Sequence, residues 1–356
     1  MRIRNWFSFV VVVFLSTLLA SNLHFGFAGI VQAQTPAITA PTESFVQSVA
    51  NVGMTVSDMN QAIDFYSKVL HFQKISDVEI SGTPYEQLQG IVGLRERVVQ
   101  MKLGQETIEL TAYFTPKGRP IPIDSHSNDL WFQHIAIVVN DMEKAYTILR
   151  QNKVQYVSSE PQTLPPSIPA AAGIKAFYFR DPDGHNLEII YFPADKGAPR
   201  WQSPTKELFL GIDHTAIAVA NTEQSLKFYR DILGLKVAGE SENFGNEQEH
   251  LNNVFGARLH ITGLRSQQGP GIEFLEYLSP PGGRPAPDDI HPNDLVYWQT
   301  TIVTKDLDIL AQRLRESKTF LISPGVVTLP DGKLGFTKAL LVRDPDGHAL
   351  RLVTPN

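Results

Sequence analysis

Apolar and polar positions along this chain form short runs that recur in one order. The first run, at 46–56, predicts a strand because its apolar and polar residues alternate weakly. A helix is expected next, since apolar residues from Ala62 to Leu70 recur at helical spacing behind Asp58, a suitable N-cap. Further strand-like runs lie at 72–80, 97–103 and 106–114. This segment therefore predicts a βαβββ unit.

The same unit returns three more times along the chain. The leading strand and helix are expected at 132–139 and 141–151, at 210–219 and 222–233, and at 296–304 and 306–316. The remaining strands are expected at 154–158, 176–179 and 187–192, at 235–239, 257–263 and 271–278, and at 320–323, 338–342 and 349–353. We predict an α+β fold of two tandem domains, 44–195 and 208–356, joined by a linker at 196–207.

Repeated sequence motifs support the division into two tandem domains. The stretch Arg-Asp-Pro-Asp-Gly-His at 180–185 recurs at 343–348. Pro presets one turn dihedral, Asp bonds nearby amides and Gly accepts positive φ, so both copies predict the turn of a β-hairpin. Phe-Tyr, Ile-Glu and Asn-Asp-Leu also recur, at 65–66 and 228–229, at 108–109 and 272–273, and at 128–130 and 293–295. A period this long indicates two copies of one domain rather than a solenoid.

The N-terminus has the pattern of a secretory signal peptide. Arg2 and Arg4 precede an apolar stretch at 6–20, and small residues follow up to Ala33. We expect a signal peptide at 1–33, cleaved near Ala33, a flexible segment at 34–43, and a periplasmic or secreted protein. An uncleaved N-terminal membrane anchor is the alternative.

Composition narrows the function further. The net charge is −6 with no basic cluster, so nucleic acid is not an expected partner. The chain contains no cysteine, which excludes disulfides, thiolate metal ligands and a cysteine nucleophile. We expect a small-molecule partner, and a monomer is compatible with the pattern.

Four βαβββ units, Phe-Tyr on the first helix and the Asp-Pro-Asp-Gly-His turn resemble the vicinal oxygen chelate superfamily, the glyoxalase, bleomycin-resistance and extradiol-dioxygenase group. The resemblance covers about 44–356. It implies that paired units form cup-shaped mixed sheets, and that a cup holds one divalent metal ion in the enzymes of the family.

The resemblance also implies where metal ligands lie, on the first and last strands of each unit. In chain order these positions hold Asn51 and Glu109, His134 and Glu188, His214 and Glu273, and Gln299 and Arg351. Units two and three thus supply two imidazoles and two carboxylates, a suitable donor set for a divalent ion. Units one and four supply Asn51, Glu109, Gln299 and Arg351, and a guanidinium repels a cation. One complete site beside one degenerate site is expected.

Two pairings of the units are possible. In tandem glyoxalases, units two and three form one cup while units one and four form the other. In extradiol dioxygenases and some epimerases, each cup is formed within one domain. We favour the first arrangement because it gathers the suitable ligands in one cup.

Plainer interpretations stand beside these assignments. His134 and His214 could be structural, and Glu188 and Glu273 could point outward to solvent. Glu109 and Arg351 are expected to form a buried ion pair in place of a metal. The histidines at 185 and 348 are read as turn residues, and the repeated Phe-Tyr pairs as helix packing.

The resemblance implies a metal-dependent lyase or isomerase in which Glu188 removes a proton, with Glu273 as its opposite partner. A ring-cleaving dioxygenase and a non-catalytic small-molecule binding protein remain as alternatives. Glyoxalase I usually carries an arginine four residues after its first ligand, to bind glutathione. Here Thr55 and Ala218 occupy those positions, which argues against a glutathione thioester.

Overall fold

The computed structural model describes residues 44–355, and all of them belong to one compact unit of the chain. The predicted signal peptide at 1–33 and the predicted flexible segment at 34–43 lie outside the described residues. Within the described range, no helix combines the length and the apolarity that crossing a membrane requires.

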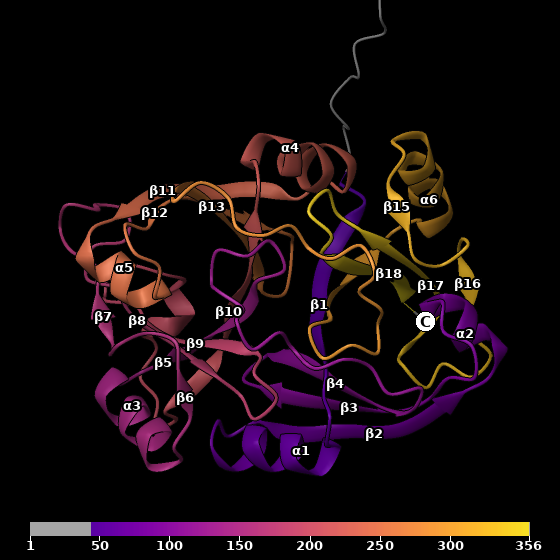
Figure 1. Cartoon of the computed structure of the whole chain (residues 1–356), viewed down its shortest axis with the longest axis horizontal. Coiled ribbons are helices and arrows are strands. Elements are labelled where there is room, and N and C mark those ends of the chain that lie inside the picture. Colours follow the sequence, from indigo (N-terminus) through magenta and orange to yellow (C-terminus); the bar gives the residue numbers. More distant parts are fainter. Residues whose placement is uncertain (1–43, 356) are drawn as a thin grey trace, which may run out of the picture. The chain divides into compact units, whose positions relative to one another are not determined.

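The chain is built of four similar modules (Figure 1). Module one contains β1 (Val46–Thr55), α1 (Met59–Lys68), β2 (Gln73–Ser81), α2 (Thr83–Gln89), β3 (Arg95–Leu103) and β4 (Glu106–Thr115). Module two contains β5 (Gln133–Val139), α3 (Met142–Gln151), β6 (Gln155–Tyr156), β7 (Gln162–Thr163), β8 (Lys175–Arg180) and β9 (Asn186–Tyr191).

The short 3-10 helix η1 (Pro199–Gln202) follows, and then the pattern repeats. Module three contains β10 (Phe209–Val219), α4 (Thr222–Leu226), the π-helical η2 (Lys227–Ile232), β11 (Lys236–Phe244), α5 (Asn246–Asn252), β12 (Arg258–Arg265) and β13 (Gly271–Ser279). Module four contains β14 (Trp298–Thr304), α6 (Leu307–Glu316), β15 (Phe320–Leu321), β16 (Val327–Thr328), β17 (Phe336–Arg343) and β18 (Ala349–Pro355). The predicted α+β class and the four-module organisation are confirmed.

The modules pair across the two halves of the chain. Strand β5 of module two lies antiparallel to β10 of module three, so these modules form one sheet in the order β11-β12-β13-β10-β5-β9-β8-β6. Strand β1 lies antiparallel to β14, and modules one and four form the other sheet in the order β15-β17-β18-β14-β1-β4-β3-β2. Figure 1 shows this second sheet as indigo strands continuing into yellow ones. The favoured cross-domain pairing is therefore the one adopted, and the within-domain pairing is not.

The structure contains elements that the pattern did not predict. Helices α2 and α5 occupy segments without a long apolar period, and each is only seven residues long. Strand β11 ends at Phe244 rather than at 239, because its solvent-facing residues hide the alternation. The helix expected at 222–233 is divided into α4 and η2. Strands β7 and β16 have two residues each, too few to show any period.

The repeated turn motif forms as predicted, and it also ties modules together. Asp181 Oδ1 accepts hydrogen bonds from the backbone N–H groups of Asp183 and His185, and Gly184 takes φ of 96°. The other Asp181 oxygen, Oδ2, accepts a bond from Tyr66 Oη on α1 at 3.1 Å. In the second half, Tyr229 Oη bonds Asp344 Oδ2 at 3.0 Å in the same way. The two Phe-Tyr motifs thus have a structural role, as expected.

Two long loops, 116–132 and 280–297, exchange arginine–aspartate pairs. Arg119 Nη2 lies 2.7 Å from Asp294 Oδ2, and Arg284 Nη2 lies 2.7 Å from Asp129 Oδ2. Both aspartates belong to the repeated Asn-Asp-Leu motif, and both are buried. These pairs therefore connect the two halves of the chain.

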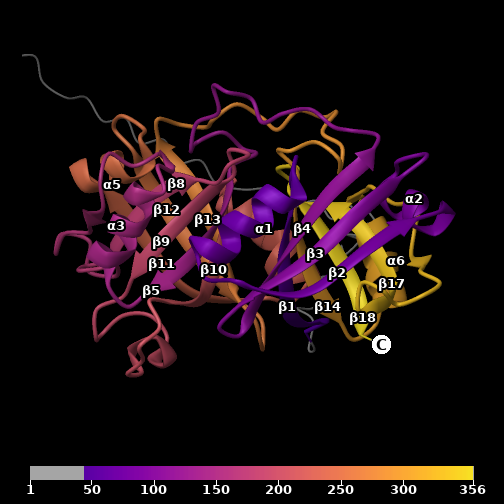
Figure 2. The same cartoon turned by 90° about the horizontal axis from the view of Figure 1, so that it is seen from below.

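The largest apolar core lies between the helices and both sheets. Tyr66 and Ala62 on α1 pack in one cluster with Ile108 of β4 and Ile137 of β5. Figure 2 shows α1 lying across β3 and β4. Because the outer faces of the sheets are covered in this way, the concave faces are left to form the two cups.

Candidate metal centre

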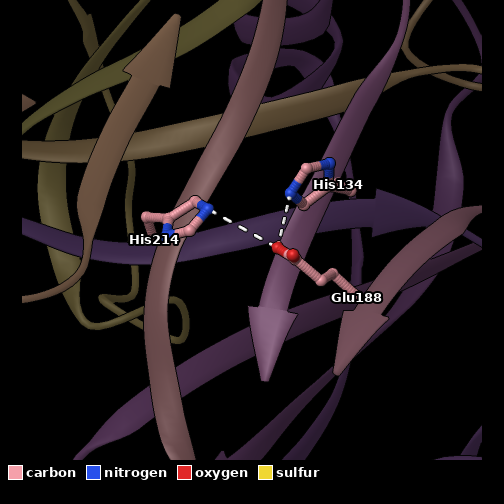
Figure 3. Close-up of side chains that lie close together, drawn as sticks. All are labelled: His134, Glu188 and His214. Atoms are coloured by element: carbon pink, nitrogen blue, oxygen red, sulfur yellow. Dashed lines mark ion pairs between the residues drawn. The ribbon is translucent and has the colours of Figure 1, made fainter. Parts of the chain in front are cut away.

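Three predicted ligands meet in the cup formed by modules two and three. His134 on β5, Glu188 on β9 and His214 on β10 point toward one another (Figure 3), and their ligand atoms all lie within 4.8 Å. Glu188 Oε2 is 3.1 Å from His134 Nε2 and 3.7 Å from His214 Nε2. Strand register explains the convergence: Ala136 pairs with His214 on one side and with Glu188 on the other.

The buried nitrogens of this cluster lack hydrogen-bond partners. Both ring nitrogens of His134 and the Nε2 atom of His214 make no hydrogen bond with any described residue. His134 has no exposed surface, and its Nε2 atom lies 3.1 Å from Glu188 Oε2 without the alignment of a hydrogen bond, so this buried ring costs free energy unless something else binds it. Imidazole and carboxylate donors at one point suit a divalent ion such as Zn²⁺, Fe²⁺ or Mn²⁺. The residues present therefore fit a metal, held by His134, His214 and Glu188.

The fourth predicted ligand, Glu273 on β13, stands slightly apart. Its Oε1 atom is 3.6 Å from His214 Nε2, but it is not among the three residues that meet within 4.8 Å. Its side chain is 25% exposed, against 5% for Glu188. Glu273 is thus the more accessible of the two carboxylates, and both line the same cavity.

A carboxylate that we had not singled out orients His214. Asp213 Oδ2 lies 3.0 Å from His214 Nδ1, which leaves Nε2 directed at Glu188 and Glu273. Asp213 is itself held by Trp201 Nε1 at 2.9 Å and by Arg265 Nη2 at 2.6 Å. A carboxylate behind a histidine ligand fixes its tautomer and raises its basicity. The three contacts therefore hold the His214 ring ready for a cation.

Charges in this cluster shift the pKa of its members. Burial alone would lower the pKa of His214, but the neighbouring carboxylates outweigh it and raise the pKa to about 9. Burial also raises the pKa of Glu273, and the charge of His214 offsets part of that rise. A proton on His214 and a bound cation compete for the same nitrogen, so metal binding releases protons here.

The cluster opens into a cavity of about 320 Å³. The residues that line this cavity include Glu188, His214 and Glu273. Tyr178 also lines it, and its ring centroid is 4.8 Å from that of His134. The aliphatic and aromatic side chains of Leu164, Ile174, Ile190 and Phe192 line another side. This volume suits a small organic molecule rather than a peptide.

The cup of modules one and four is closed. Arg351 makes two hydrogen bonds to Glu109, at 2.8 and 2.9 Å, and this predicted ion pair is confirmed. Gln299 Nε2 lies 3.4 Å from Glu109 Oε1, while Asn51 is buried on β1 with Oδ1 unpaired among the described residues. The remaining space is about 10 Å³, too little for a ligand.

The turn histidines do not belong to either site. His185 bonds Asp181 through Nδ1 and the backbone oxygen of Leu295 through Nε2, each at 2.8 Å. His348 Nε2 bonds the backbone oxygen of Ala218 at 2.8 Å. Asp213 escaped prediction because a β-bulge between Ile212 and His214 lets two adjacent residues act at one site. Its only sequence signal is its position directly before His214.

Comparison with known proteins gives the family. The model for the Glyoxalase/Bleomycin resistance protein/Dioxygenase superfamily matches residues 48–189 and again residues 211–352. A 2-epi-5-epi-valiolone epimerase from Actinomyces sp. is 30% identical over 173 residues, 46% of this chain and 87% of that protein. The metallothiol transferase FosB of Staphylococcus epidermidis is 27% identical over 146 residues, 40% of this chain and 81% of that protein.

Solved structures agree on the fold. Glyoxalase I from Zea mays superposes with a TM-score of 0.55 at 17% identity, covering 86% of this chain and 92% of that one. A putative dioxygenase from Bacillus subtilis gives a TM-score of 0.53 at 15% identity, covering 88% and 86%. Two matches of one family model, one in each half of a chain with this fold, show that the protein belongs to the Glyoxalase/Bleomycin resistance protein/Dioxygenase superfamily.

Proposed function

We propose that this protein is a divalent-metal-dependent isomerase or lyase that acts on a small substrate with two adjacent oxygens. One observation carries the proposal: His134, His214 and Glu188 come from opposite halves of the chain and converge with unpaired ring nitrogens. The family includes metal-dependent enzymes, and its named relatives here are an epimerase and a metallothiol transferase. A bound divalent ion acts as a Lewis acid that polarises a substrate carbonyl.

The two carboxylates take different parts in this proposal. Glu188 lies between both histidines and is almost fully buried, which suits a fixed ligand. Glu273 is more exposed and borders the cavity, so its oxygens reach a substrate carbon. From the family resemblance, Glu188 was the expected base. The geometry favours Glu273 as the group that takes and returns the proton.

Metal content and proton exchange test both parts. The full-length protein purified without added metal should contain about one divalent ion per chain, by elemental analysis, and His134→Ala should lose it. Gln299→Ala changes the equivalent position in the closed cup and should leave the metal content unaltered. Hydroxyacetone in D₂O then reports proton abstraction: Glu273→Gln should keep the metal and lose deuterium exchange, whereas Glu188→Gln should lose both. Metal that remains in His134→Ala would overturn the proposal.

One observation favours a second function. Two histidines and one carboxylate are the ligand set of mononuclear non-haem Fe(II) oxygenases, and His134, His214 and Glu188 supply that set. Oxygen uptake by the Fe(II)-loaded protein with a catechol would support a ring-cleaving dioxygenase. Proton exchange that persists without oxygen would support the isomerase or lyase.

A further inference from the structure

Three amide side chains form a chain of hydrogen bonds at one end of the open cup. Asn243, near the end of β11, donates from Nδ2 to Gln248 Oε1 at 3.0 Å, and Gln248 on α5 donates to Asn252 Oδ1. All three are at most 4% exposed. Asn243 Oδ1, at one end of the chain, has no partner among the described residues, whereas Asn252 Nδ2, at the other end, lies against the hydroxyl groups of Tyr178 and Tyr277.

An amide chain of this kind must leave one acceptor and one donor free. If each amide were turned over, the free acceptor and the free donor would exchange ends, because each bond uses one oxygen and one nitrogen. Buried groups of both kinds without partners are costly. The tyrosine hydroxyls beside Asn252 can serve that end in either orientation, so the Asn243 end is the one that a ligand hydroxyl, which both donates and accepts, can satisfy from the cavity.

The amides share the cavity with the metal centre. Asn243 and Gln248 line the cavity together with Glu188 and Glu273. Asn252 lies beside the hydroxyl groups of Tyr178 and Tyr277, and the Tyr178 ring is next to His134. Tyr277 and Asn243 both pair with Leu259, which places them in one row across the sheet. That row lies four residues along β13 from Glu273, roughly 13 Å on the same face.

The closed cup shows what these positions hold when there is no cavity. Asn243 pairs with Leu259 as Ile80 pairs with Glu96, so Asn243 and Ile80 are equivalent. Gln248 and Tyr85 are each the third residue of the helix that follows. Ile80 and Tyr85 pack in an apolar cluster, whereas Asn243 and Gln248 border open space. Packing alone therefore does not require amides at these two positions, whereas the third amide, Asn252, has an amide equivalent in the closed cup, Gln89.

The cavity offers no free positive charge to an anionic substrate. Of the described residues that line it, the one with a permanent positive charge is Arg265, which is paired with Asp213 at 2.6 Å. Gly271 lets this guanidinium lie against the backbone, since a Cβ there would be 2.8 Å from its carbon. Glu188, Glu273 and Glu240 border the same space. Apart from the cation bound at His134, His214 and Glu188, a phosphate or carboxylate at the far end of the substrate would meet acids without a counter-charge.

We infer that the Asn243–Gln248–Asn252 cluster binds hydroxyl groups of a neutral, polyhydroxylated ketone whose carbonyl end faces His134, His214 and Glu188. The inference rests on the proposed function for the carbonyl end and adds the substrate class. The distance between the two ends requires a molecule longer than the chelating pair of oxygens, and the cavity volume accommodates five or six carbons with their hydroxyls.

Three ligands test this inference. The affinity of the metal-loaded protein for each is measured by calorimetry. Hydroxyacetone carries the chelating pair alone, D-xylulose adds neutral hydroxyls, and D-xylulose 5-phosphate adds a dianion to the same carbon chain. We expect D-xylulose to bind about ten-fold more tightly than hydroxyacetone. The phosphate ester should bind more weakly than D-xylulose.

The variant Asn243→Ile copies the residue at the equivalent position of the closed cup. It should bring D-xylulose and hydroxyacetone to within about two-fold of each other and leave metal content unaltered. If Asn243→Ile does not fold, the same ratio of affinities can be measured in Asn243→Ser, which is a smaller change. Ile80→Val in the closed cup is the control and should preserve the wild-type ratio.

The outcomes separate this inference from the proposed function. Wild-type protein that holds no metal would overturn both. Metal-loaded protein that binds hydroxyacetone and D-xylulose equally well, or prefers the phosphate ester, would overturn the substrate class alone. An undiminished preference for D-xylulose in both Asn243 variants would overturn the role of the amide cluster.

Discussion

The two cups of this molecule have the same strand order, yet one is open and the other is filled. In the open cup Glu188 stands where the closed cup has Arg351, as the pairing with Ala136 and Thr301 shows. That exchange replaces an anionic donor by a cation, and the cation then takes Glu109 as its partner. A candidate metal ligand and an arginine thus occupy equivalent positions in two copies of one fold.

The second difference between the cups is the position of their buried polar side chains beyond the ligand positions. The closed cup contains Glu96, whose equivalent in the open cup is Leu259, and Glu96 Oε2 has no hydrogen-bond partner among the described residues. The open cup has its polar groups at Asn243 and Gln248, where they border the cavity. The comparison teaches that the cup without the cluster of candidate ligands is also the cup whose interior is filled.

The largest expected effect comes from breaking the ion pair of the closed cup. Arg351→Met leaves Glu109 buried and unpaired, and should lower the free energy of unfolding by about 3–5 kcal/mol. Urea denaturation at pH 7 measures this. Adding Glu109→Gln to the same chain should restore most of the loss, and a double variant as unstable as Arg351→Met would contradict the assignment.

Glu96 should make stability depend on pH. Burial raises its pKa from 4.5 to about 7, and hydrogen bonds from Gln89 and Tyr113 only partly offset this. Because the folded pKa lies above the unfolded one, the contribution is most favourable below pH 4.5 and is lost as the pH rises to about 7. The loss amounts to about 3 kcal/mol, and Glu96→Gln should abolish it. Denaturation of both proteins at pH 5 and pH 8 checks the difference; parallel curves would contradict it.

Asp213 should affect metal affinity rather than the fold. Asp213→Asn keeps the shape but weakens the hold on His214 Nδ1, and should reduce metal affinity about 10- to 100-fold. Competition with a chromophoric chelator measures the affinity. Thermal unfolding of the metal-free proteins is the control, since a purely structural role would lower their stability instead.

The smallest effect is expected at the two turns. Tyr229→Phe removes the hydroxyl that bonds Asp344, and Tyr66→Phe removes its counterpart on Asp181; each should cost about 1 kcal/mol. The Tyr66 hydrogen bond connects modules one and two, and the Tyr229 hydrogen bond connects modules three and four. Equal losses would show that the two halves are equivalent away from the cups, and a loss confined to one variant would show that they are not.

The sequence allowed the modules and the turn motif to be predicted because each leaves a local pattern, whereas the eight ligand positions followed from the resemblance to the family. Strand alternation marks β5 and β10, and Asp-Pro-Asp-Gly specifies its own turn. The amides of α5 and the role of Asp213 could not be predicted in this way. Gln248 sits on a helix without an apolar period, and Asp213 depends on a β-bulge that only pairing with β5 reveals.

Each concave sheet takes one module from each half of the chain, and this arrangement bears on how such a molecule can diverge. If two identical subunits paired in this way, every substitution would enter both binding sites at once, and neither could be abandoned alone. Joining the copies in one polypeptide removes that restriction. Arg351 can then occupy on one side the position that Glu188 occupies on the other, so one chain can hold a set of candidate metal ligands in one cup and a buried ion pair in its twin.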